Sequence, residues 1–512
     1  MPILTIDQNH YEVSTGITIL EALSLLNIYH DAPCGGMGKC KKCAVVATGS
    51  LSPLTEVESD LPSGMRLACI ARIEGDVTLT LSDELAAEIE TGGLSQSMTP
   101  DRGEGYAIAC DIGTTTVVCH LERLSDGMRL DSIGEINRQR PYGADVISRI
   151  SASLKEEFLK AQHRAIVEEI EEMSLALLQK HLLSPADCRL VTIAGNTTME
   201  LLFAGISPAP LAELPFTSPT LFGYDIPSPF RALSPERVFL FPCAESFVGG
   251  DITSAVLAAG FFRKDSPSLL LDIGTNGEMA LGNHNRLTCA AAAAGPAFEG
   301  ADISCGMSSL AGAIDTVTFD GKLHFTTIGN APAKGICGSG LIDALAVLLE
   351  IGAVDETGRL LPPDECEEEA EPYITEEDDG VAFHFYPSDV VITAGDIRKL
   401  QLASAAIRAG LETLLDDAEL SADDLDKLYI AGGFGSHIRL SSAVRIGMIP
   451  KELFGKCIFM GNGAGEGASM AARSSHAEEE AQAIHKKFEY LDLSTSPVWQ
   501  DLYIEYMMFP EE

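Results

Sequence analysis

Four cysteines near the N-terminus have the residue type and the spacing of a metal-cluster site. Cys34, Cys40 and Cys43 lie on one glycine-rich loop, and Cys69 follows twenty-six residues after Cys43. A cluster needs thiolates that converge on one point, and glycines let a loop wrap closely around inorganic sulfide. The C-x5-C-x2-C spacing is one residue longer than the plant-type spacing and lacks the two short knuckles of a zinc site. We predict that these cysteines bind a [2Fe–2S] cluster, with zinc or incidental thiols as the alternatives.

A second chemistry is indicated by a unit that occurs twice, 161 positions apart. Asp111-Ile-Gly-Thr-Thr-Thr116 and Asp272-Ile-Gly-Thr-Asn-Gly277 each follow a strand-like run. Backbone N–H groups and threonine hydroxyls bind phosphate oxygens, and an aspartate at a strand end can hold Mg²⁺ through water. We expect Asp111 and Asp272 beside Mg²⁺. The predicted phosphate-binding residues are Gly113, Thr114, Thr115, Thr116, Gly274, Thr275, Asn276 and Gly277.

A third element is a buried strand that breaks into a glycine-rich turn, Leu428-Tyr-Ile-Ala-Gly-Gly-Phe-Gly-Ser436. Such a turn can hold adenosine by backbone contacts, so we expect Gly432, Gly433 and Phe434 to bind it. Three further carboxylates are candidates for positioning the attacking water: Glu245, Asp251 and Glu278. For each of these three, a solvated or helix-capping carboxylate is the alternative interpretation.

The elements that carry the cysteines are short. Ile3–Ile6, Tyr11–Val13 and Val77–Leu81 are strand-like, and Thr18–Leu26 has the apolar spacing of a helix. Two strands, a helix, a cysteine loop and further strands resemble a β-grasp ferredoxin, an α+β domain, over about residues 1–82. The lysines of the loop either neutralise the thiolates or form a docking rim for an acidic electron donor; they are Lys39, Lys41 and Lys42.

Strands alternate with helices from residue 106 onward, which predicts an α/β body. Because the strand–D-x-G-T–strand unit recurs, we expect two related lobes, 106–265 and 266–512. Residues 83–105 have few large apolar side chains and predict a flexible linker, with an ordered junction as the alternative. The carboxylate-rich stretch 360–380 predicts a solvated insertion in the second lobe.

Two phosphate motifs followed by an adenosine motif resemble the ATPases of the actin, heat-shock chaperone and sugar-kinase superfamily. Five runs narrow the resemblance: NRQRPYGADVISRI (137–150), VTIAGNTTME (191–200), AAGPAFEGADIS (293–304), ICGSGLIDAL (336–345) and AGGFGSHI (431–438). With the ferredoxin, the chain resembles the ATP-dependent reductive activators of corrinoid proteins. It departs from them at Glu200, where a histidine is expected, and in lacking the longer members' extra sequence between ferredoxin and ATPase.

The resemblance implies two duplicated ribonuclease-H-like lobes that bind and hydrolyse ATP with Mg²⁺. It implies transfer of one electron from the [2Fe–2S] cluster to Co(II) of a corrinoid protein, which regenerates Co(I) for methyl transfer. A low-potential electron donor and a homodimer are what the family suggests. The rival hypotheses are a ferredoxin-fused small-molecule kinase, an activator of a radical-type dehydratase and a redox-sensing ATPase scaffold.

Composition narrows the class of protein further. The 512 residues carry a formal net charge of −40, which disfavours nucleic acid and anionic membrane surfaces as partners. We find no apolar run of about 18 residues and no basic stretch before an apolar core at the start of the chain, so we expect a cytoplasmic protein. In that reducing compartment the nine remaining cysteines are expected to be buried thiols.

Overall fold

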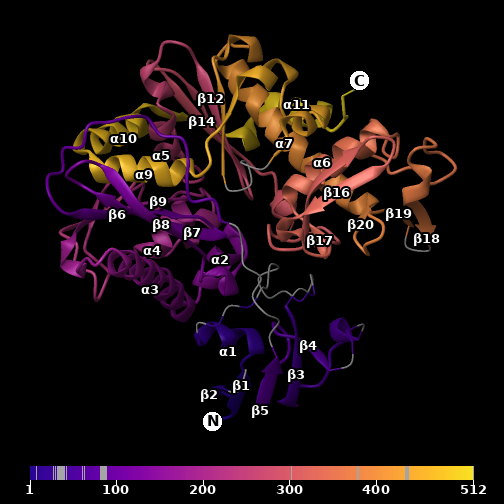
Figure 1. Ribbon diagram of the computed structural model, residues 1–512, viewed down its shortest axis with the longest axis horizontal. Coiled ribbons are helices and arrows are strands. Elements are labelled where there is room, and N and C mark those ends of the chain that lie inside the picture. The colour runs from indigo at the N-terminus through magenta and orange to yellow at the C-terminus, as the bar shows by residue number, and fades with distance from the viewer. Residues whose placement is uncertain are drawn as a thin grey trace.

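The structure is a computed structural model of the chain. It describes residues 1–6, 9–26, 28, 30, 38, 41, 43–59, 61–62, 64–80, 89–300, 302–377, 380–432 and 438–510. Figure 1 shows a small N-terminal domain below a larger body of two lobes. Among the described residues, no helix has the length and apolar character that crossing a membrane requires.

The N-terminal domain is a five-stranded sheet in the order β2-β1-β5-β3-β4, with one helix packed against it. Its first strand pairs in parallel with its last, the defining feature of a β-grasp fold. Ile73, Val77 and Leu79 of the last strand are buried while their neighbours face outward, as a half-buried strand requires. Its elements are β1 (Ile3–Ile6), β2 (Asn9–Glu12), α1 (Ile19–Leu25), β3 (Ala44–Leu51), β4 (Met65–Leu67) and β5 (Ile73–Thr80).

Each lobe of the body is built on a six-stranded sheet. The sheet of lobe 1 has the order β10-β11-β9-β6-β7-β8, and that of lobe 2 has the order β22-β21-β12-β13-β14-β23. The strands of lobe 1 are β6 (Tyr106–Ile112), β7 (Thr116–Arg123), β8 (Met128–Ile136), β9 (Cys188–Gly195), β10 (Tyr224–Ile226) and β11 (Arg237–Leu240). Those of lobe 2 are β12 (Ser268–Ile273), β13 (Gly277–Gly282), β14 (Leu287–Ala292), β21 (Leu428–Ala431), β22 (Cys457–Phe459) and β23 (Phe488–Tyr490).

Five strands of one sheet correspond to five strands of the other. In both lobes the first three strands form an antiparallel meander, and the fourth and fifth add in parallel beside the first. The shared order is β8-β7-β6-β9-β11 in lobe 1 and β14-β13-β12-β21-β22 in lobe 2. This repeated topology confirms the expected α/β body of two duplicated lobes.

Helices cover the outer face of the sheet in each lobe. Lobe 1 carries α2 (Val146–Ser153), α3 (Glu156–Lys180) and α4 (Thr197–Phe203). Lobe 2 carries α6 (Gly338–Glu350), α7 (Ala394–Asp417), α8 (Leu440–Arg445) and α11 (Pro497–Glu505). Two small sheets extend lobe 2, one of β15 (Ala313–Phe319), β16 (Leu323–Thr327) and β17 (Gly335–Ile336), the other of β18 (Ile374–Glu377), β19 (Gly380–His384) and β20 (Val391–Thr393).

Two helices cross between the sheets and join the lobes through one shared apolar core. Helix α5 (Gly250–Ala259) packs against β9 of lobe 1 and against β12 and β13 of lobe 2, and α9 (Gly463–Arg473) packs against α5 and against β6, β7 and β9 of lobe 1. They approach so closely that a Cβ on Gly467 would lie 2.0 Å from the carbonyl oxygen of Ser254. Figure 1 shows α9 and α10 (Ser475–Lys487), from near the C-terminus, over the strands of lobe 1.

The segment 89–105, called the strap below, is ordered on the body. Its backbone pairs with the Met460–Asn462 turn, and Arg102 donates to the carbonyl oxygens of Ala471 and Ser474. The predicted flexible linker is therefore wrong for residues 89–105, because backbone hydrogen bonds and ion pairs replace the apolar contacts that the sequence lacks. Of the predicted linker, residues 83–88 lie outside the described part.

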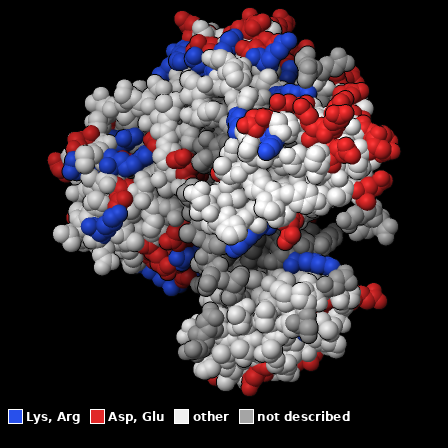
Figure 2. Space-filling model, turned by 45° about the vertical axis from the view of Figure 1, so that its right-hand side comes forward, with Lys and Arg blue, Asp and Glu red and all other residues white. Residues whose placement is uncertain are grey.

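The acidic stretch near residue 370 lies at the edge of lobe 2. Ala370 and Ile374 are buried against its core, while Glu367, Glu368 and Glu369 are exposed. Figure 2 shows carboxylates gathered over the upper right of the body, far from the basic side chains between body and N-terminal domain. The exposed carboxylates agree with a solvated insertion.

Candidate nucleotide and cluster sites

The four predicted catalytic carboxylates come together where the two sheets end. Asp111 and Asp272 are the next-to-last residues of β6 and β12, and Glu278 on β13 lies directly opposite Asp272. Asp251 joins them from the first turn of α5. The ends of β6 and β12 lie together between the two lobes. Residues up to 167 positions apart in the sequence therefore form one half-buried acidic group.

Burial and mutual repulsion act on all four carboxylates. Burial, then the charges of Asp251 and Asp272, raise the pKa of Asp111 to about 8. Burial and the charge of Asp251 raise the pKa of Asp272 to about 7, and burial raises that of Asp251 to about 6. The pKa of Glu278 is raised well above its usual range by burial first and by Asp251 and Asp272 next. A group of this kind gains stability from a nearby cation.

The donor set fits Mg²⁺ held through water rather than by direct ligation. In the described part of the chain, no three His, Cys, Asp or Glu side chains converge closely enough to ligate one metal ion. Mg²⁺ keeps several waters and binds one or two carboxylates together with substrate phosphates. Asp111 and Asp272 are the residues that could hold such an ion through its waters.

Three residues that the sequence did not assign brace the loop after Asp111. Asn137 donates through its side chain to the carbonyl of Gly113 at 2.8 Å, and the fully buried Arg149 donates to the carbonyl of Thr114. Asn196 donates to the Thr114 hydroxyl at 3.0 Å. These donors hold the carbonyls of Gly113 and Thr114 and the Thr114 hydroxyl, and they therefore fix the conformation of the loop.

The corresponding loop of lobe 2 has a different support. Thr275 donates its hydroxyl hydrogen to Glu299 at 2.7 Å, and Gly274 N–H donates to the carbonyl of Asn276 at 3.0 Å. Glu299 lies at the end of a one-turn helix whose Phe298 is buried in the lobe 2 core. Burial raises the pKa of Glu299, whereas Arg140 and Arg149 of lobe 1 lower it. Glu299, also unassigned from sequence, therefore lies between the second loop and the cations of the opposite lobe.

A short repeat in the sequence would have pointed to Asn196. The fourth strands end in Ile193-Ala-Gly-Asn196 in lobe 1 and Ile430-Ala-Gly-Gly433 in lobe 2. A Cβ on Gly195 would lie 2.9 Å from the carbonyl oxygen of Ile112, and one on Gly432 2.8 Å from that of Ile273. The two glycines thus have the same steric role, which makes Asn196 the counterpart of the predicted adenosine turn. Gly433 and Phe434 lie outside the described residues.

Two carboxylates stand apart from this group. Glu245 accepts from the backbone and hydroxyl of Ser246, and its charge raises the pKa of Cys289 and Tyr490 rather than that of Asp111, Asp251 or Asp272. The structure does not bring Glu245 to the site. Glu200 is fully buried, with its Oε1 only 2.3 Å from where a Cβ on Gly250 of α5 would lie, and burial raises its pKa well above the ordinary value.

The described cysteines of the N-terminal domain fit the predicted cluster. The sulfur atoms of Cys43 and Cys69 lie 3.3 Å apart, although 26 residues separate them. Gly38, on the loop between Cys34 and Cys40, approaches the Cys69 segment so closely that a Cβ would lie 2.6 Å from Cδ1 of Ile70. Gly38 and Cys43 therefore both lie beside the Cys69 segment. Cys34, Cys40, Lys39 and Lys42 lie outside the described residues.

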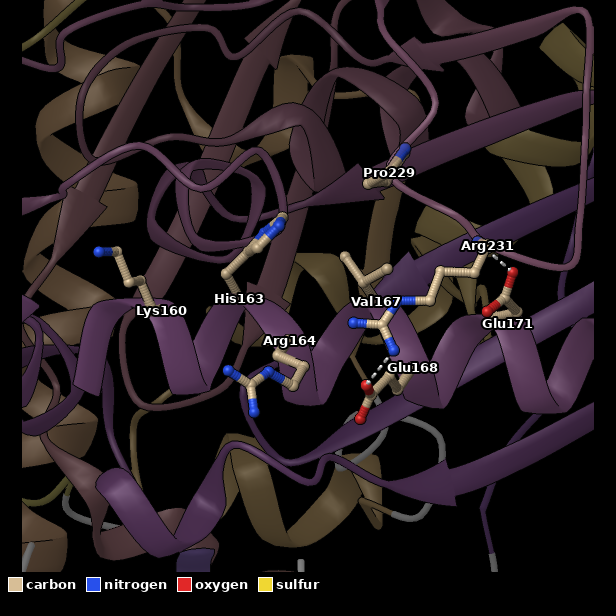
Figure 3. Close-up of a pocket in the computed structure, with 8 residues that line it drawn as sticks. All are labelled: Lys160, His163, Arg164, Val167, Glu168, Glu171, Pro229 and Arg231. Atoms are coloured by element: carbon tan, nitrogen blue, oxygen red, sulfur yellow. Dashed lines mark hydrogen bonds and ion pairs between the residues drawn. The ribbon is translucent and has the colours of Figure 1, made fainter. Parts of the chain in front are cut away.

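A cavity of about 250 Å³ lies elsewhere, on the outer face of α3 (Figure 3). Its charges are satisfied locally: Arg231 lies 3.6 Å from Glu168, and Glu171 accepts three backbone N–H groups beginning at Arg231. None of the predicted site residues lines it. Its lining residues are Lys160, His163, Arg164, Val167, Glu168, Glu171, Pro229 and Arg231.

The fold defines an actin-like ATPase fused to a ferredoxin-type domain. The ATPase has duplicated lobes with strand-end aspartates and two crossing helices, and the ferredoxin-type domain is a β-grasp fold in which Cys43 and Cys69 lie together. Residues 266–512 match the family model described as the C-terminal, ASKHA domain of RACo, and residues 106–264 match the RACo middle region. The corrinoid activation enzyme RamQ of Eubacterium limosum is 34% identical over 423 residues, which cover 79% of this chain and 70% of RamQ. The chain belongs to the RACo family.

Two further comparisons agree with this family. The Co(II) methylated amine-specific corrinoid protein reductase of Methanosarcina barkeri is 26% identical over 384 residues, covering 67% of this chain and 66% of the relative. The two curated relatives are thus longer than the part this chain matches. The solved structure of a reductive activator for corrinoid,iron-sulfur protein is 29% identical, covers 100% of this chain and 99% of its own, and has a TM-score of 0.69.

Proposed function

We propose that this protein is an ATP-dependent reductive activator that returns the cobalt of a corrinoid protein from Co(II) to Co(I) for methyl transfer. One observation carries the proposal: a single chain holds two cysteine sulfur atoms 3.3 Å apart in a β-grasp domain, and a group of acidic side chains at the strand ends of two duplicated lobes. A [2Fe–2S] cluster held by Cys34, Cys40, Cys43 and Cys69 supplies the one electron that the reduction requires.

The energetic reason for an ATPase is the low potential of Co(I). Plant-type clusters have potentials near −400 mV, and a one-electron shortfall of about 59 mV is a tenfold loss in equilibrium constant. A gap of roughly 0.2 V then costs about 4–5 kcal/mol. Nucleotide binding can offset this cost if the nucleotide-bound arrangement of the lobes prefers one state of the corrinoid protein.

The residues of the body have separate parts in this proposal. Asp111 and Asp272 hold the water shell of Mg²⁺, the loops at Gly113 and Gly274 bind phosphates, and Gly432 begins the adenosine turn. Asp251 and Glu278 orient the attacking water, since both reach the acidic group from elements beside Asp272. We further propose that a low-potential donor reduces the cluster, that the protein forms a homodimer and that it is cytoplasmic. The proposed domain boundaries are 1–82 for the ferredoxin-type domain, 106–265 for lobe 1 and 266–512 for lobe 2.

The test is anaerobic reduction of purified Co(II) corrinoid proteins by this protein and a titanium(III) reductant, with and without Mg·ATP. We expect the Co(I) absorption band to grow only with Mg·ATP. Cys69→Ser should abolish reduction and keep ATP hydrolysis, whereas Asp272→Asn should lose both. Reduction that is independent of ATP would contradict the proposal. Phosphorylation of a small molecule at the expense of ATP would favour the ferredoxin-fused kinase hypothesis instead.

A further inference from the structure

Asn137 joins the predicted phosphate loop of lobe 1 to a one-turn helix of the same lobe, η2 (Arg140–Tyr142). Its backbone N–H donates to the carbonyl of Thr115 at 2.9 Å, and its side-chain amide donates to that of Gly113 at 2.8 Å. On the other side, its side-chain oxygen accepts from Gln139 N–H at 2.8 Å, and its carbonyl accepts from the first N–H of η2 at 3.1 Å. All four polar groups of this fully buried residue therefore hold the loop and η2 together.

Arg149 forms a second connection between the same two parts. Its guanidinium donates to the carbonyl of Thr114 in the loop. It also donates to the Gln139 side chain at 3.3 Å and to the carbonyl of Gly143 at 2.9 Å, and these two residues flank η2 at its ends. Two fully buried side chains thus connect the loop to η2, so a restriction of one is transmitted to the other.

The N-terminal domain lies against η2. Helix α1 of that domain contacts η2, and Figure 1 shows α1 below α2 of lobe 1. At the start of α1, Ile19 N–H donates to the carbonyl of Ala71 at 2.9 Å. Leu20 N–H donates to the carbonyl of Ala68 at 2.7 Å, next to the predicted cluster ligand Cys69. Hydrogen bonds therefore connect α1 to the predicted cluster site, as they connect η2 to the predicted phosphate loop.

We propose that Asn137 is a positioning residue that couples nucleotide binding to the docking of the N-terminal domain on lobe 1. This inference rests on the proposed function in requiring that the loop at Gly113 binds phosphate. A bound phosphate restricts the loop, and the restricted loop restricts η2 through Asn137 and Arg149. Part of the entropy cost of ordering η2 against α1 is then already incurred by nucleotide binding, so α1 docks more tightly. By linkage, a docked domain strengthens nucleotide binding by the same factor.

The first experiment measures hydrogen–deuterium exchange of the full chain with and without saturating Mg·ADP, in peptides covering 19–26 and 137–143. We expect Mg·ADP to slow exchange in both peptides about fivefold, the lower end of ordinary coupling between two sites. Asn137→Asp keeps the acceptor for Gln139 N–H and replaces the donor to the Gly113 carbonyl with a second acceptor. In this variant we expect Mg·ADP to slow exchange at 19–26 by less than about twofold.

The matched control is Asn283→Asp, in the β13–β14 hairpin of lobe 2. The Asn283 side chain has the same pattern of hydrogen bonds, since it donates to the carbonyl of Asp265 at 2.9 Å and accepts from Asn285 N–H at 2.9 Å. These bonds lie within lobe 2, so this variant should show the wild-type response to Mg·ADP in both peptides.

A second substitution at Asn137 protects the test against a local effect of the new charge. Asn137→Ser keeps an oxygen that can accept from Gln139 N–H, but its side chain is too short to reach the Gly113 carbonyl. We expect it to respond to Mg·ADP as Asn137→Asp does. The inference is overturned if wild type binds Mg·ADP without slower exchange at 19–26, or if either Asn137 variant, once saturated, shows the wild-type slowing. Absence of Mg·ADP binding by wild type would overturn both this inference and the proposed function.

Discussion

The two lobes share a sheet topology and differ in the side chains that support their predicted phosphate loops. In lobe 1, Asp111 faces Val118 across the hairpin, whereas in lobe 2 Asp272 faces Glu278. The first loop is braced by Asn137 and a buried arginine, and the second by the acid Glu299. Duplication therefore preserved the positions of the aspartates while the surroundings of the two loops diverged.

This difference assigns separate tasks to the two loops. In lobe 1 the carbonyls of Gly113 and Thr114 accept hydrogen bonds from side chains, so the loop is held in one conformation. The threonine of lobe 2 donates to a carboxylate and can exchange that acceptor for a phosphate oxygen. Arg140 and Arg149 of lobe 1 lower the pKa of Glu299, so the carboxylate that supports the second loop also responds to charges of the opposite lobe.

The largest expected effect tests what the lobes have in common. Asp111→Asn and Asp272→Asn should each lower the rate of ATP hydrolysis about 10³-fold, because each removes a charge from the Mg²⁺ shell. Steady-state hydrolysis, with nucleotide binding measured separately, checks this. Asp126→Asn, on an exposed turn, is the control and should hydrolyse ATP normally. If one aspartate proves dispensable, the two halves do not act together.

The second prediction compares how much Arg149 and Glu299, which support the two loops, contribute to stability. Arg149→Met leaves the carbonyls of Gly143 and Thr114 without their donor, so it should lower the free energy of unfolding by about 3 kcal/mol. Glu299→Gln keeps an acceptor for Thr275 and should cost less than about 1 kcal/mol. The exposed Arg123→Met should change stability by less than about 0.5 kcal/mol. Denaturant titration measures all three, and equal losses for Arg149 and Glu299 would contradict the distinction.

The third prediction concerns pH. The pKa values of Asp111, Asp272 and Asp251 in the folded protein, about 8, 7 and 6, exceed that of an unfolded aspartate. Between about pH 4 and pH 8 the folded state then binds more protons, so nucleotide-free stability falls as pH rises through 6 to 8. We expect the melting midpoint to drop by a few degrees over that window. Mg·ADP should restore it most at high pH.

The aspartate of lobe 1 should dominate this pH effect because its pKa is the highest. Asp111→Asn should flatten the dependence of the melting midpoint on pH more than Asp272→Asn does. A nucleotide-free midpoint that rises between pH 6 and pH 8 would show that the carboxylates are already ionised in the folded protein.

The smallest expected effect separates the two threonines. Thr275→Val leaves Glu299 without a donor next to the phosphates and should raise the KM for ATP about fivefold, which corresponds to about 1 kcal/mol. Thr114→Val should raise it about twofold, because Asn137 and Arg149 still hold the loop. Initial-rate kinetics distinguish the two. The reverse order would mean that the first loop, rather than the second, adjusts to the nucleotide.

Much of the site was predictable because its signals are local. A D-x-G-T turn after a strand has the same meaning wherever it occurs, so Asp111 and Asp272 were predicted. Asn137, Arg149 and Glu299 were not, because each acts on a loop to which no local pattern connects it. Glu245 was also a candidate, but the structure places its carboxylate beside Ser246 rather than in the acidic group, because the position of such a side chain is set by how the chain folds.

By itself the sequence determined the two repeated lobes and the two aspartates at their strand ends, and it predicted from spacing a four-cysteine cluster site and a glycine-rich adenosine turn. Only the tertiary structure decided which distant groups brace each loop and where residues 89–105 lie. The strap escaped prediction because backbone hydrogen bonds and a close glycine approach hold it, and these leave no hydrophobic pattern in the sequence. Long-range polar contacts are set by the packing of whole sheets and helices, which no local motif records.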